Sequence, residues 1–385
     1  MRGGVRRGES GSTEGRRAAE QLSVVASREP VMSDPTIERV EAVGVEAPLE
    51  EPFGYAQAWV ETRTATLVRV ATSDGTVGWG ECWGPVAGTR EVVEDVLAPH
   101  VLGEDPREVE RLYDRLYDVG RATYQTVVPL PAISAIDIAL WDLAGKLRDE
   151  PVATLLGGAR RESVRPYATG HYFPKVEDVE AVYEKVVPEA EANADALGAV
   201  KLKTGLSLLG YGPDEDVELV RRVREAVGPD VTVMVDANYA YDRTAARRVG
   251  RALEEQGVHW FEEPVAPEDI EGYARLSRTL DVPIAGGECH TPAEFDRLFE
   301  RGGLDVAQPD VCIVGGLTPA RRIARRAYDH GVPLVPHVWG TPVALAASLQ
   351  LIATLPTEPW LEFDRSPNPL REELAVESFA PDDGL

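Results

Sequence analysis

The sequence Ala199-Val-Lys-Leu-Lys-Thr204 is a short apolar segment that carries two lysines, and a helical stretch follows it. Similar segments cover residues 164–169, 231–236, 258–262, 282–288, 304–309, 332–337 and 360–363. The polar residues that end these segments recur every 22 to 33 residues, which is about the length of one strand, one helix and two loops. This repeat predicts an α/β fold with an eight-stranded parallel barrel, and its active site is expected at the carboxyl ends of the strands.

A different pattern precedes the barrel. Residues 36–74 alternate between apolar and polar, and the turn dipeptide Asp74-Gly75 comes before another alternating run, which predicts a β-hairpin. Helical periodicity follows in residues 90–98, 106–118 and 131–146. We therefore expect an α+β domain over residues 34–163 and the barrel over residues 164–365.

The two ends of the chain differ from the rest. Residues 1–31 are rich in glycine, serine and arginine, and they show no amphipathic period. We expect residues 1–33 to be a disordered tail or a wrongly assigned start, with Met32 as the native first residue. The chain stops in the turn-like sequence Asp382-Asp-Gly-Leu385, so we expect residues 366–385 to be a truncated segment.

The composition limits the classes of function. The chain has 385 residues, and its net charge of −25 argues against nucleic acid and anionic membranes as partners. It contains no apolar run of about 18 residues, so no transmembrane helix is expected. The three cysteines are too dispersed for a disulfide framework, and we expect a cytoplasmic protein. The excess of acidic residues, with few lysines among the basic ones, is typical of halophilic proteins, whereas a GC-rich genome would explain only the lack of lysine.

Three carboxylates, Asp236, Glu262 and Glu288, end consecutive strands of the predicted barrel. Neighbouring strands would bring them together at one rim, where their mutual repulsion favours a divalent cation. An all-oxygen ligand set favours Mg²⁺, with Mn²⁺ as an alternative. A single carboxylate of this kind could equally cap the next helix, but three in succession indicate a metal site.

Lys201 and Lys203 lie two residues apart on one strand, so their side chains share a face. Each charge should depress the pKa of the other amine, which would leave one amine free as a general base. The alternative is a solvated pair on an edge strand. Only five lysines occur in the whole chain, which favours a functional role for this pair.

Asp310 and His337 end the sixth and seventh strands, and Glu362 lies on the eighth. A carboxylate on a neighbouring strand can orient an imidazole and raise its basicity. Together these residues suit removal of a proton next to a carboxylate. Lys203 would take the proton from one face, Mg²⁺ and Lys201 would stabilise the enediolate, and His337 would act on the other face. Glu362 could donate or accept a hydrogen bond with the carboxylate of a bound substrate.

The chain resembles the enolase superfamily, in its mandelate racemase subgroup, from about Thr36 to the end. The motifs that carry the resemblance are Lys201-Leu-Lys203, Asp236-Ala-Asn238, Trp260-Phe-Glu262-Glu-Pro, Gly286-Gly-Glu288, Gln308-Pro-Asp310 and Pro336-His337-Val-Trp-Gly. The resemblance implies a (β/α)7β barrel that is capped by an N-terminal α+β domain and by the last segment of the chain. It also implies that the three strand-end carboxylates bind Mg²⁺, and that the protein forms a homo-oligomer.

For single residues, the resemblance implies that Lys203 is the base and that Glu263 supports the metal ligands from behind. It marks Asn238 as a contact to the substrate or to the metal's surroundings. Two cap segments, residues 50–62 and 84–88, would set specificity. Candidate substrate contacts in these segments and after the first barrel strand are Phe53, Tyr55, Trp59, Trp83 and His171, although aromatic residues in a cap serve equally often in packing.

Within the subgroup the chain is most similar to the galactarolactone cycloisomerases. The similar runs begin at Asp74, Ile136, Val164 and Glu362. That family opens a sugar-diacid lactone by β-elimination and yields a 3-deoxy-2-keto acid. The alternatives are an acid-sugar dehydratase that acts on galactarate, gluconate or a similar acid, a racemase or epimerase that uses Lys203 and His337 as two bases, and a barrel without catalytic activity.

Overall fold

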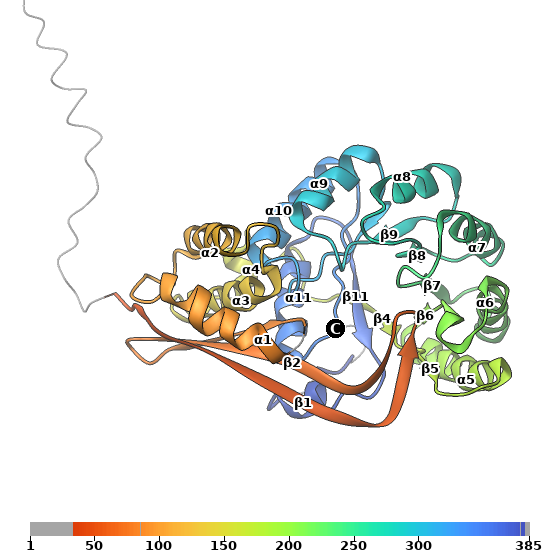
Figure 1. Cartoon of the computed structure of the whole chain (residues 1–385), viewed down its shortest axis with the longest axis horizontal. Coiled ribbons are helices and arrows are strands. Elements are labelled where there is room, and N and C mark those ends of the chain that lie inside the picture. Colours follow the sequence, from red (N-terminus) through yellow and green to blue (C-terminus); the bar gives the residue numbers. More distant parts are fainter. Residues whose placement is uncertain (1–33, 85, 378, 382–385) are drawn as a thin grey trace, which may run out of the picture. The chain divides into compact units, whose positions relative to one another are not determined.

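The computed structural model describes residues 34–84, 86–377 and 379–381. The expectations for residues 1–33 and for the last four residues lie outside this part of the chain. Seven parallel strands form one curled sheet in the order β10-β9-β8-β7-β6-β4-β11 (Figure 1). Their bounds are β4 (Arg165–Thr169), β6 (Ala199–Lys203), β7 (Thr232–Asp236), β8 (Phe261–Glu262), β9 (Ile284–Gly286), β10 (Val306–Ala307) and β11 (Trp360–Asp364).

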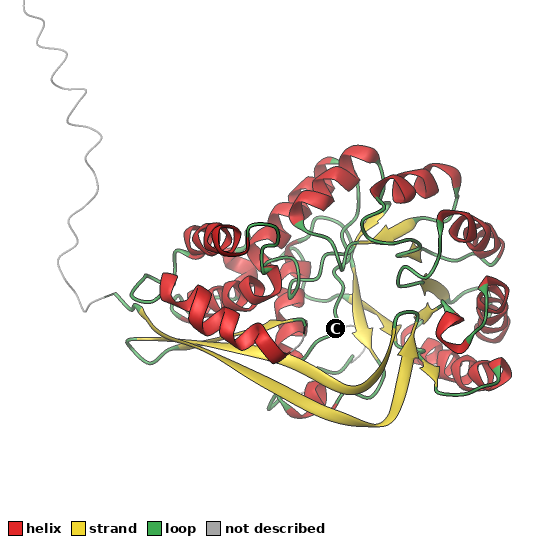
Figure 2. Cartoon of the chain, viewed as in Figure 1, coloured by secondary structure: helices red, strands yellow, loops and turns green. Residues whose placement is uncertain are grey.

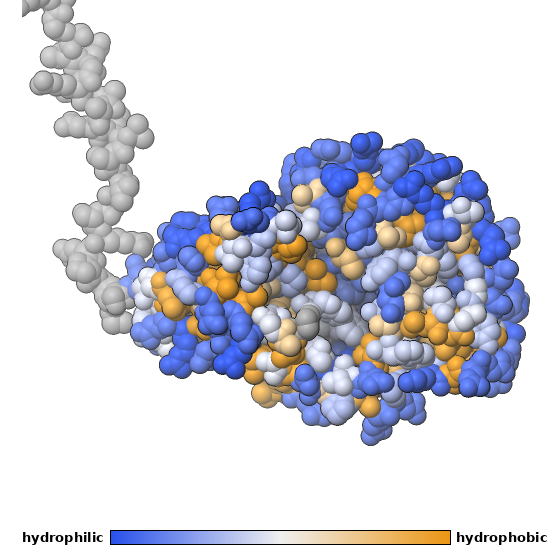
Figure 3. Space-filling model, viewed as in Figure 1, coloured by the Kyte–Doolittle hydropathy of each residue, from blue (hydrophilic) through white to orange (hydrophobic). Residues whose placement is uncertain are grey.

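Seven helices surround this sheet, and each packs an apolar stripe against it (Figure 1). They are α5 (Val179–Leu197), α6 (Pro213–Val227), α7 (Arg243–Glu255), α8 (Ile270–Thr279), α9 (Pro292–Arg301), α10 (Leu317–Asp329) and α11 (Pro342–Thr354). In α6, for example, Leu219, Val220 and Val223 are fully buried, whereas charged residues cover the opposite side. On the face shown in Figure 3, hydrophilic residues accordingly dominate the outer rim.

The predicted eight strands correspond to seven strands and one irregular segment. Residues 332–337 pair with β10 only through the bridge between Ala307 and Leu334. Two backbone hydrogen bonds of 2.9 Å support this bridge, from Ala307 N to Pro333 O and from Val335 N to Ala307 O. Pro333 and Pro336 have no N–H group to donate, so the segment cannot form a regular ladder.

The inner face of the sheet has two layers. Its lower layer is an apolar cluster formed by Tyr167, Ala199, Met234, Trp260, Ala285, Val306 and Val335. Side chains alternate along a strand, so the residues two positions further on share this inner face. On β6, β7 and β8 these are Lys201, Asp236 and Glu262, which are all buried. The apolar layer therefore closes the barrel beneath a charged upper layer.

An antiparallel sheet precedes the barrel, in the order β3-β2-β1-β5 (Figure 2). Its strands are β1 (Ile37–Tyr55), β2 (Ala58–Thr72), β3 (Val77–Cys82) and β5 (Phe173–Pro174). The predicted turn at Asp74-Gly75 joins β2 to β3, and Gly75 has a φ of 88° there. The cap segment at residues 50–62 forms the end of the β1–β2 hairpin.

The remaining helical segments lie in the N-terminal region, in the barrel after β6 and near the end of the chain. They are α1 (Val86–Glu91), η1 (Val92–Leu97), η2 (Ala98–His100), α2 (Val109–Tyr124), α3 (Leu130–Lys146), α4 (Val152–Leu155), η3 (Leu206–Leu209) and α12 (Pro369–Glu373). The helices predicted at 106–118 and 131–146 correspond to α2 and α3, whereas the stretch predicted at 90–98 is mostly the π-helix η1. No helix among the described residues is long and apolar enough to cross a membrane.

The N-terminal region and the barrel share one hydrophobic core, which includes Val68 of β2, Ile136 of α3 and Val235 of β7. Buried polar contacts add to this packing. Arg63 on β2 forms an ion pair of 3.0 Å with Asp364 at the end of β11. The structure thus confirms an α/β fold with a curled parallel sheet and an N-terminal capping sheet.

Candidate active site

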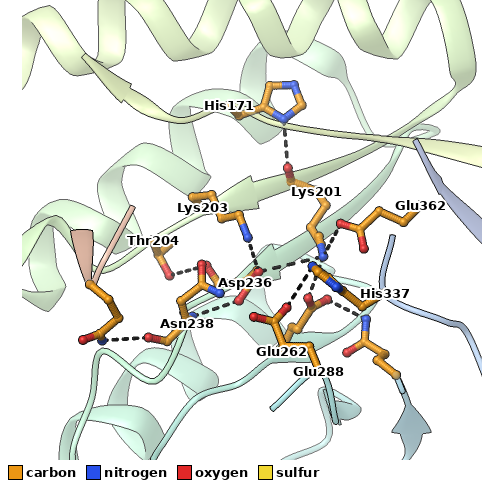
Figure 4. Close-up of polar contacts among 12 residues, drawn as sticks. His171, Lys201, Lys203, Thr204, Asp236, Asn238, Glu262, Glu288, His337 and Glu362 are labelled. Atoms are coloured by element: carbon orange, nitrogen blue, oxygen red, sulfur yellow. Dashed lines mark hydrogen bonds and ion pairs between the residues drawn. The ribbon is translucent and has the colours of Figure 1, made fainter. Parts of the chain in front are cut away.

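The backbone register of the parallel sheet explains how the candidate residues converge. Lys203 on β6 pairs with Asp236 on β7, and Asp236 pairs with Glu262 on β8. All three residues end their strands, so they form one row across the carboxyl end of the barrel. Figure 4 shows their side chains pointing toward a common centre.

Glu288 joins this row from the loop after β9. Gly287 precedes it with a φ of +140°, and a Cβ atom at this position would lie 2.5 Å from the Phe295 ring. Only glycine fits there, which lets the chain turn and brings Glu288 to the centre. Oxygens of Asp236, Glu262 and Glu288 lie within 4.8 Å of one another, and their all-oxygen chemistry fits Mg²⁺.

Other polar groups fix the orientation of these carboxylates. Asn238 N donates to Asp236 Oδ1 at 2.8 Å. Trp260 Nε1 and Gln308 Nε2 donate to Glu262 Oε2 at 3.0 and 2.7 Å. Sequence reasoning noted Trp260 and Gln308 within motifs but gave them no role, because only the fold shows that both side chains reach Glu262.

Each of the two lysines forms ion pairs with carboxylates, and these pairs determine the direction of its pKa shift. Lys201 Nζ lies 2.6 Å from Glu262 Oε1 and 2.7 Å from Glu362 Oε1, and Lys203 Nζ donates to Asp236 Oδ2. Burial lowers the pKa of both amines, but these carboxylates outweigh it and hold both pKa values above the ordinary lysine range. Lys201 does lower the pKa of Lys203, as expected, but the carboxylates outweigh this effect, so the net shift is upward.

His337 lies between two carboxylates. Its Nδ1 is 2.7 Å from Asp310 Oδ2, and its Nε2 is 3.1 Å from Glu288 Oε2. Burial lowers the pKa of His337, but Glu288, Glu362 and Asp310 raise it to about 10. The imidazole is thus oriented by Asp310 and has its second nitrogen directed at the carboxylate cluster. In Figure 4, Lys203 and His337 approach this cluster from different sides.

Glu362 on β11 connects the lysine strand to the histidine segment. One of its oxygens pairs with Lys201, and the other accepts a hydrogen bond of 3.0 Å from Val338 N. Burial raises the pKa of Glu362, but Lys201 and His337 lower it to about 2. Its carboxylate is therefore charged and held by protein groups on both sides.

Strained backbone surrounds the site. Asn238, Tyr239 and Glu263 have positive φ values of 40°, 52° and 43°, which are rare for residues other than glycine. Both carboxylate oxygens of the fully buried Glu263 have no hydrogen-bond partner within the described part of the chain. Burial, followed by repulsion from Glu288, raises the pKa of Glu263 well above the ordinary range. Asn238 Oδ1 likewise has no partner among the residues that the structure describes, while the Asn238 backbone oxygen accepts a hydrogen bond of 2.8 Å from Gln57 Nε2.

The candidate aromatic contacts differ in their surroundings. Phe53 is buried and stacks on Tyr172 at 4.2 Å between ring centroids, so it packs rather than lining an open site. The ring of Trp59 covers Gly54 within its own hairpin. Trp83 lies 6.3 Å from the His337 ring and is partly exposed. Burial raises the pKa of Tyr55, and the negative charge of Glu288 adds to this shift, so the Tyr55 hydroxyl lies within electrostatic reach of the carboxylate cluster.

The structure does not support His171 as a substrate contact. Its ring is fully buried, with Nδ1 2.8 Å from Lys201 O and Nε2 3.1 Å from Asn193 Nδ2. Burial lowers its pKa, which favours the neutral ring. Because Asn193 donates to Nε2, Nδ1 carries the proton and donates to Lys201 O. His171 therefore supports strand β6 from outside the site, as Figure 4 shows.

Comparison with known proteins agrees with this geometry. Residues 185–385 match the family described as enolase C-terminal domain-like, and residues 38–157 match the mandelate racemase/muconate lactonizing enzyme N-terminal domain. The chain belongs to the enolase superfamily. Within this superfamily it is an enzyme of the mandelate racemase/muconate lactonizing enzyme subgroup, and its relatives are cycloisomerases and acid-sugar dehydratases.

Three relatives illustrate this range. The D-galactarolactone cycloisomerase of Agrobacterium fabrum is 40% identical over 88% of this chain and 89% of that protein. The L-talarate/galactarate dehydratase of Salmonella typhimurium is 37% identical over 80% of this chain and 74% of that protein. The crystal structure of the 3,6-anhydro-D-galactonate cycloisomerase from Zobellia galactanivorans has 38% identity and a TM-score of 0.78, and it covers 88% of this chain and 90% of that chain.

A solved structure also bears on the metal. A lysine-to-alanine mutant of L-talarate/galactarate dehydratase was crystallised with Mg and L-glucarate. This structure covers 89% of this chain and 85% of that chain, with 33% identity and a TM-score of 0.75.

Proposed function

We propose that this enzyme removes the proton next to a carboxylate of a sugar acid or sugar-diacid lactone and then eliminates the β-oxygen, as a galactarolactone cycloisomerase does. The observation that carries the proposal is the placement of two potential bases, Lys203 and the His337–Asp310 pair, on different sides of three clustered carboxylates. The 40% identical D-galactarolactone cycloisomerase supports the same substrate class.

Each residue has a distinct task in this proposal. Lys203, the more accessible of the two lysines, takes the α-proton in its neutral form. Asp236 is the main cause of the raised Lys203 pKa, and Mg²⁺ bound to Asp236 would offset this effect and favour the neutral amine. Lys201 stays charged because Glu262 and Glu362 surround it, and it stabilises the negative charge that develops on the substrate carboxylate. His337, oriented by Asp310, donates a proton to the leaving oxygen on the other side.

Asp236, Glu262 and Glu288 would hold the metal. A bound Mg²⁺ would supply positive charge beside the substrate carboxylate, and this charge makes the neighbouring proton more acidic. Trp260 and Gln308 keep Glu262 in position for this role. Among the candidate substrate contacts, Trp83 and Tyr55 are the ones that we propose to line the substrate, because each lies near a charged residue of the centre.

Proton NMR in D₂O with Mg²⁺ tests the proposal. The enzyme is incubated with a panel of sugar acids, sugar diacids and their lactones. New methylene signals of a 3-deoxy-2-keto acid from a lactone would support the cycloisomerase reaction, and the same signals from an open-chain acid would support a dehydratase. Exchange of the α-proton with configurational inversion and no keto product would contradict elimination and indicate an epimerase. The several dehydratases among the relatives are the reason to include open-chain acids.

A further inference from the structure

Glu81, on the capping strand β3, reaches the segment that carries His337. Its side chain is buried, and its carboxylate accepts hydrogen bonds from Thr341 N at 3.0 Å, Thr341 Oγ1 at 2.5 Å and Ala344 N at 3.0 Å. Thr341 is the N-cap of α11, so Glu81 binds the start of this helix from the other domain. His337 lies only four residues before this contact.

The Glu81 carboxylate packs directly against the backbone of Gly340. A Cβ atom on Gly340 would lie 2.3 Å from Glu81 Oε1, so only glycine allows the carboxylate to approach the backbone here. Arg371 on α12 donates to Gly340 O through Nε at 3.1 Å and Nη2 at 2.8 Å. Residues 337–341 are thus held by Glu81 and by Arg371, which come from opposite ends of the chain.

This support matters because the barrel itself holds His337 weakly. Its segment has one bridge to β10 and two prolines, and no ladder joins it to β11 among the described residues. Val338 N instead donates to the Glu362 side chain. The hydrogen-bond partners that fix the backbone after His337 are therefore side chains, and Glu81 accepts from two of these backbone N–H groups, those of Thr341 and Ala344.

We propose that Glu81 is a positioning residue for His337, which makes the capping domain part of the catalytic apparatus on the histidine side. The inference rests on the proposed function, because the role of His337 belongs to that proposal. Glu81 touches no reacting atom. Loss of its carboxylate should let His337 move while Lys203, on the regular strand β6, keeps its place.

Asp137 on α3 provides a matched control. Its buried carboxylate accepts hydrogen bonds from Thr318 N at 3.0 Å and Thr318 Oγ1 at 2.6 Å, at the start of α10. A Cβ atom on Gly316 would lie 2.2 Å from Asp137 Oδ2. Asp137 thus makes the same kind of contact between the domains, but on a helix that does not follow the histidine segment.

The test compares the wild type with Glu81→Gln, Glu81→Ala and Asp137→Asn, each with Mg²⁺. Turnover and exchange of the substrate α-proton with D₂O are measured on the same sample. Hydrogen–deuterium exchange of backbone amides, followed by mass spectrometry, is measured for peptides that cover residues 336–345 and 199–204. Thermal unfolding identifies any variant that is not folded, and Glu81→Gln retains the size of the side chain if Glu81→Ala fails to fold.

We expect both Glu81 variants to lower kcat by roughly 10- to 100-fold, because small misplacements of a catalytic group have effects of this size. The α-proton exchange should change less than about threefold, and amide exchange should rise in 336–345 but not in 199–204. Asp137→Asn should lower the unfolding temperature without changing the ratio of exchange to turnover.

Equal loss of exchange and turnover in Glu81→Gln, or an unchanged amide exchange in 336–345, would overturn the proposal. If the wild type shows neither exchange nor turnover on the whole panel, the proposed function fails. The amide exchange then still decides whether Glu81 positions this segment.

Discussion

The two sides of the active site are held in different ways. Lys201 and Lys203 lie on β6, which has regular backbone pairing to β7 along its whole length. His337 lies on a segment with one bridge and two prolines, and the side chains of Glu362, Glu81 and Arg371 fix the backbone that follows it. The main chain of the barrel thus positions one base, whereas side chains from both ends of the chain position the other.

Substitutions should affect the positions of Lys203 and His337 to different degrees. A regular ladder tolerates few changes in the place of Lys203, because a shift in register turns a side chain to the opposite face. The histidine side can change with single substitutions in the cap or in α12. We therefore expect substitutions remote from the site to slow the proton donation by His337 and to leave the removal of the α-proton by Lys203 intact.

The largest expected effect is that of Lys203→Met. Removal of the amine abolishes the base, so both turnover and α-proton exchange should fall by roughly 10²- to 10⁴-fold. Substrate consumption and exchange are followed together by proton NMR in D₂O. Lys175→Met, which removes an exposed lysine that pairs only loosely with Glu61 at 4.0 Å, should retain both activities. Retention of exchange in Lys203→Met would show that another group is the base.

Arg371→Met should have a smaller effect on the histidine side. It removes both side-chain hydrogen bonds to Gly340 O, so we expect kcat to fall about tenfold while α-proton exchange is retained. Steady-state kinetics and NMR exchange measure the two quantities. Arg365→Met is a suitable control, because Arg365 is exposed and donates to Asn193 rather than to residues 337–341. A parallel loss of exchange in Arg371→Met would contradict the separation of the two sides.

Removal of Mg²⁺ should affect stability as well as activity. The three carboxylates repel one another, and a cation that binds only the folded state stabilises it by about 2.7 kcal/mol at 100 times its Kd. Thermal unfolding is measured with EDTA and across a MgCl₂ titration. Asp236→Asn should reduce this stabilisation, because it removes one of the clustered ligands. An identical response of the wild type and Asp236→Asn would place the Mg²⁺ elsewhere.

The smallest effect concerns the pH dependence of stability. Burial raises the pKa of Asp137 from 3.8 to about 7, although Thr318 opposes the shift. Because the folded-state pKa exceeds the unfolded value, the folded state prefers the protonated acid. The stabilisation that protonated Asp137 gives the folded state is fully present below pH 3.8, and it is lost as the pH rises through about 7. Relative to Asp137→Asn, the wild type should lose unfolding free energy between pH 5 and pH 8 in chemical denaturation, by roughly 2 kcal/mol. A constant difference between the two proteins over this range would contradict the assignment.

The sequence predicted that the two lysines share a face and that the three carboxylates lie together, because both predictions follow from residue spacing within and between strands. Period-two spacing places Lys201 and Lys203 on one face, and strand ends that recur at barrel spacing bring Asp236, Glu262 and Glu288 together. These rules depend only on the order of residues along each strand. The α/β fold and its capping sheet followed from the same patterns.

The other features depend on contacts that span the whole chain. The roles of Glu81 and Gln308 became visible only once the fold placed them beside Thr341 and Glu262. The net pKa shift of both lysines is upward rather than downward, because carboxylates that sequence spacing cannot place lie beside each amine. His171 was assigned to the substrate from its place after a strand, but its side chain turns to Lys201 O.

The measurement that tests the central claim most directly is the ratio of α-proton exchange to turnover in His337→Asn. If Lys203 and His337 act separately on two sides of the substrate, this variant should retain exchange within about threefold while turnover falls by roughly 10²- to 10⁴-fold. NMR in D₂O with Mg²⁺ records both quantities in one sample. Loss of exchange in proportion to turnover, with the fold intact by thermal unfolding, would contradict the division of roles between the two bases.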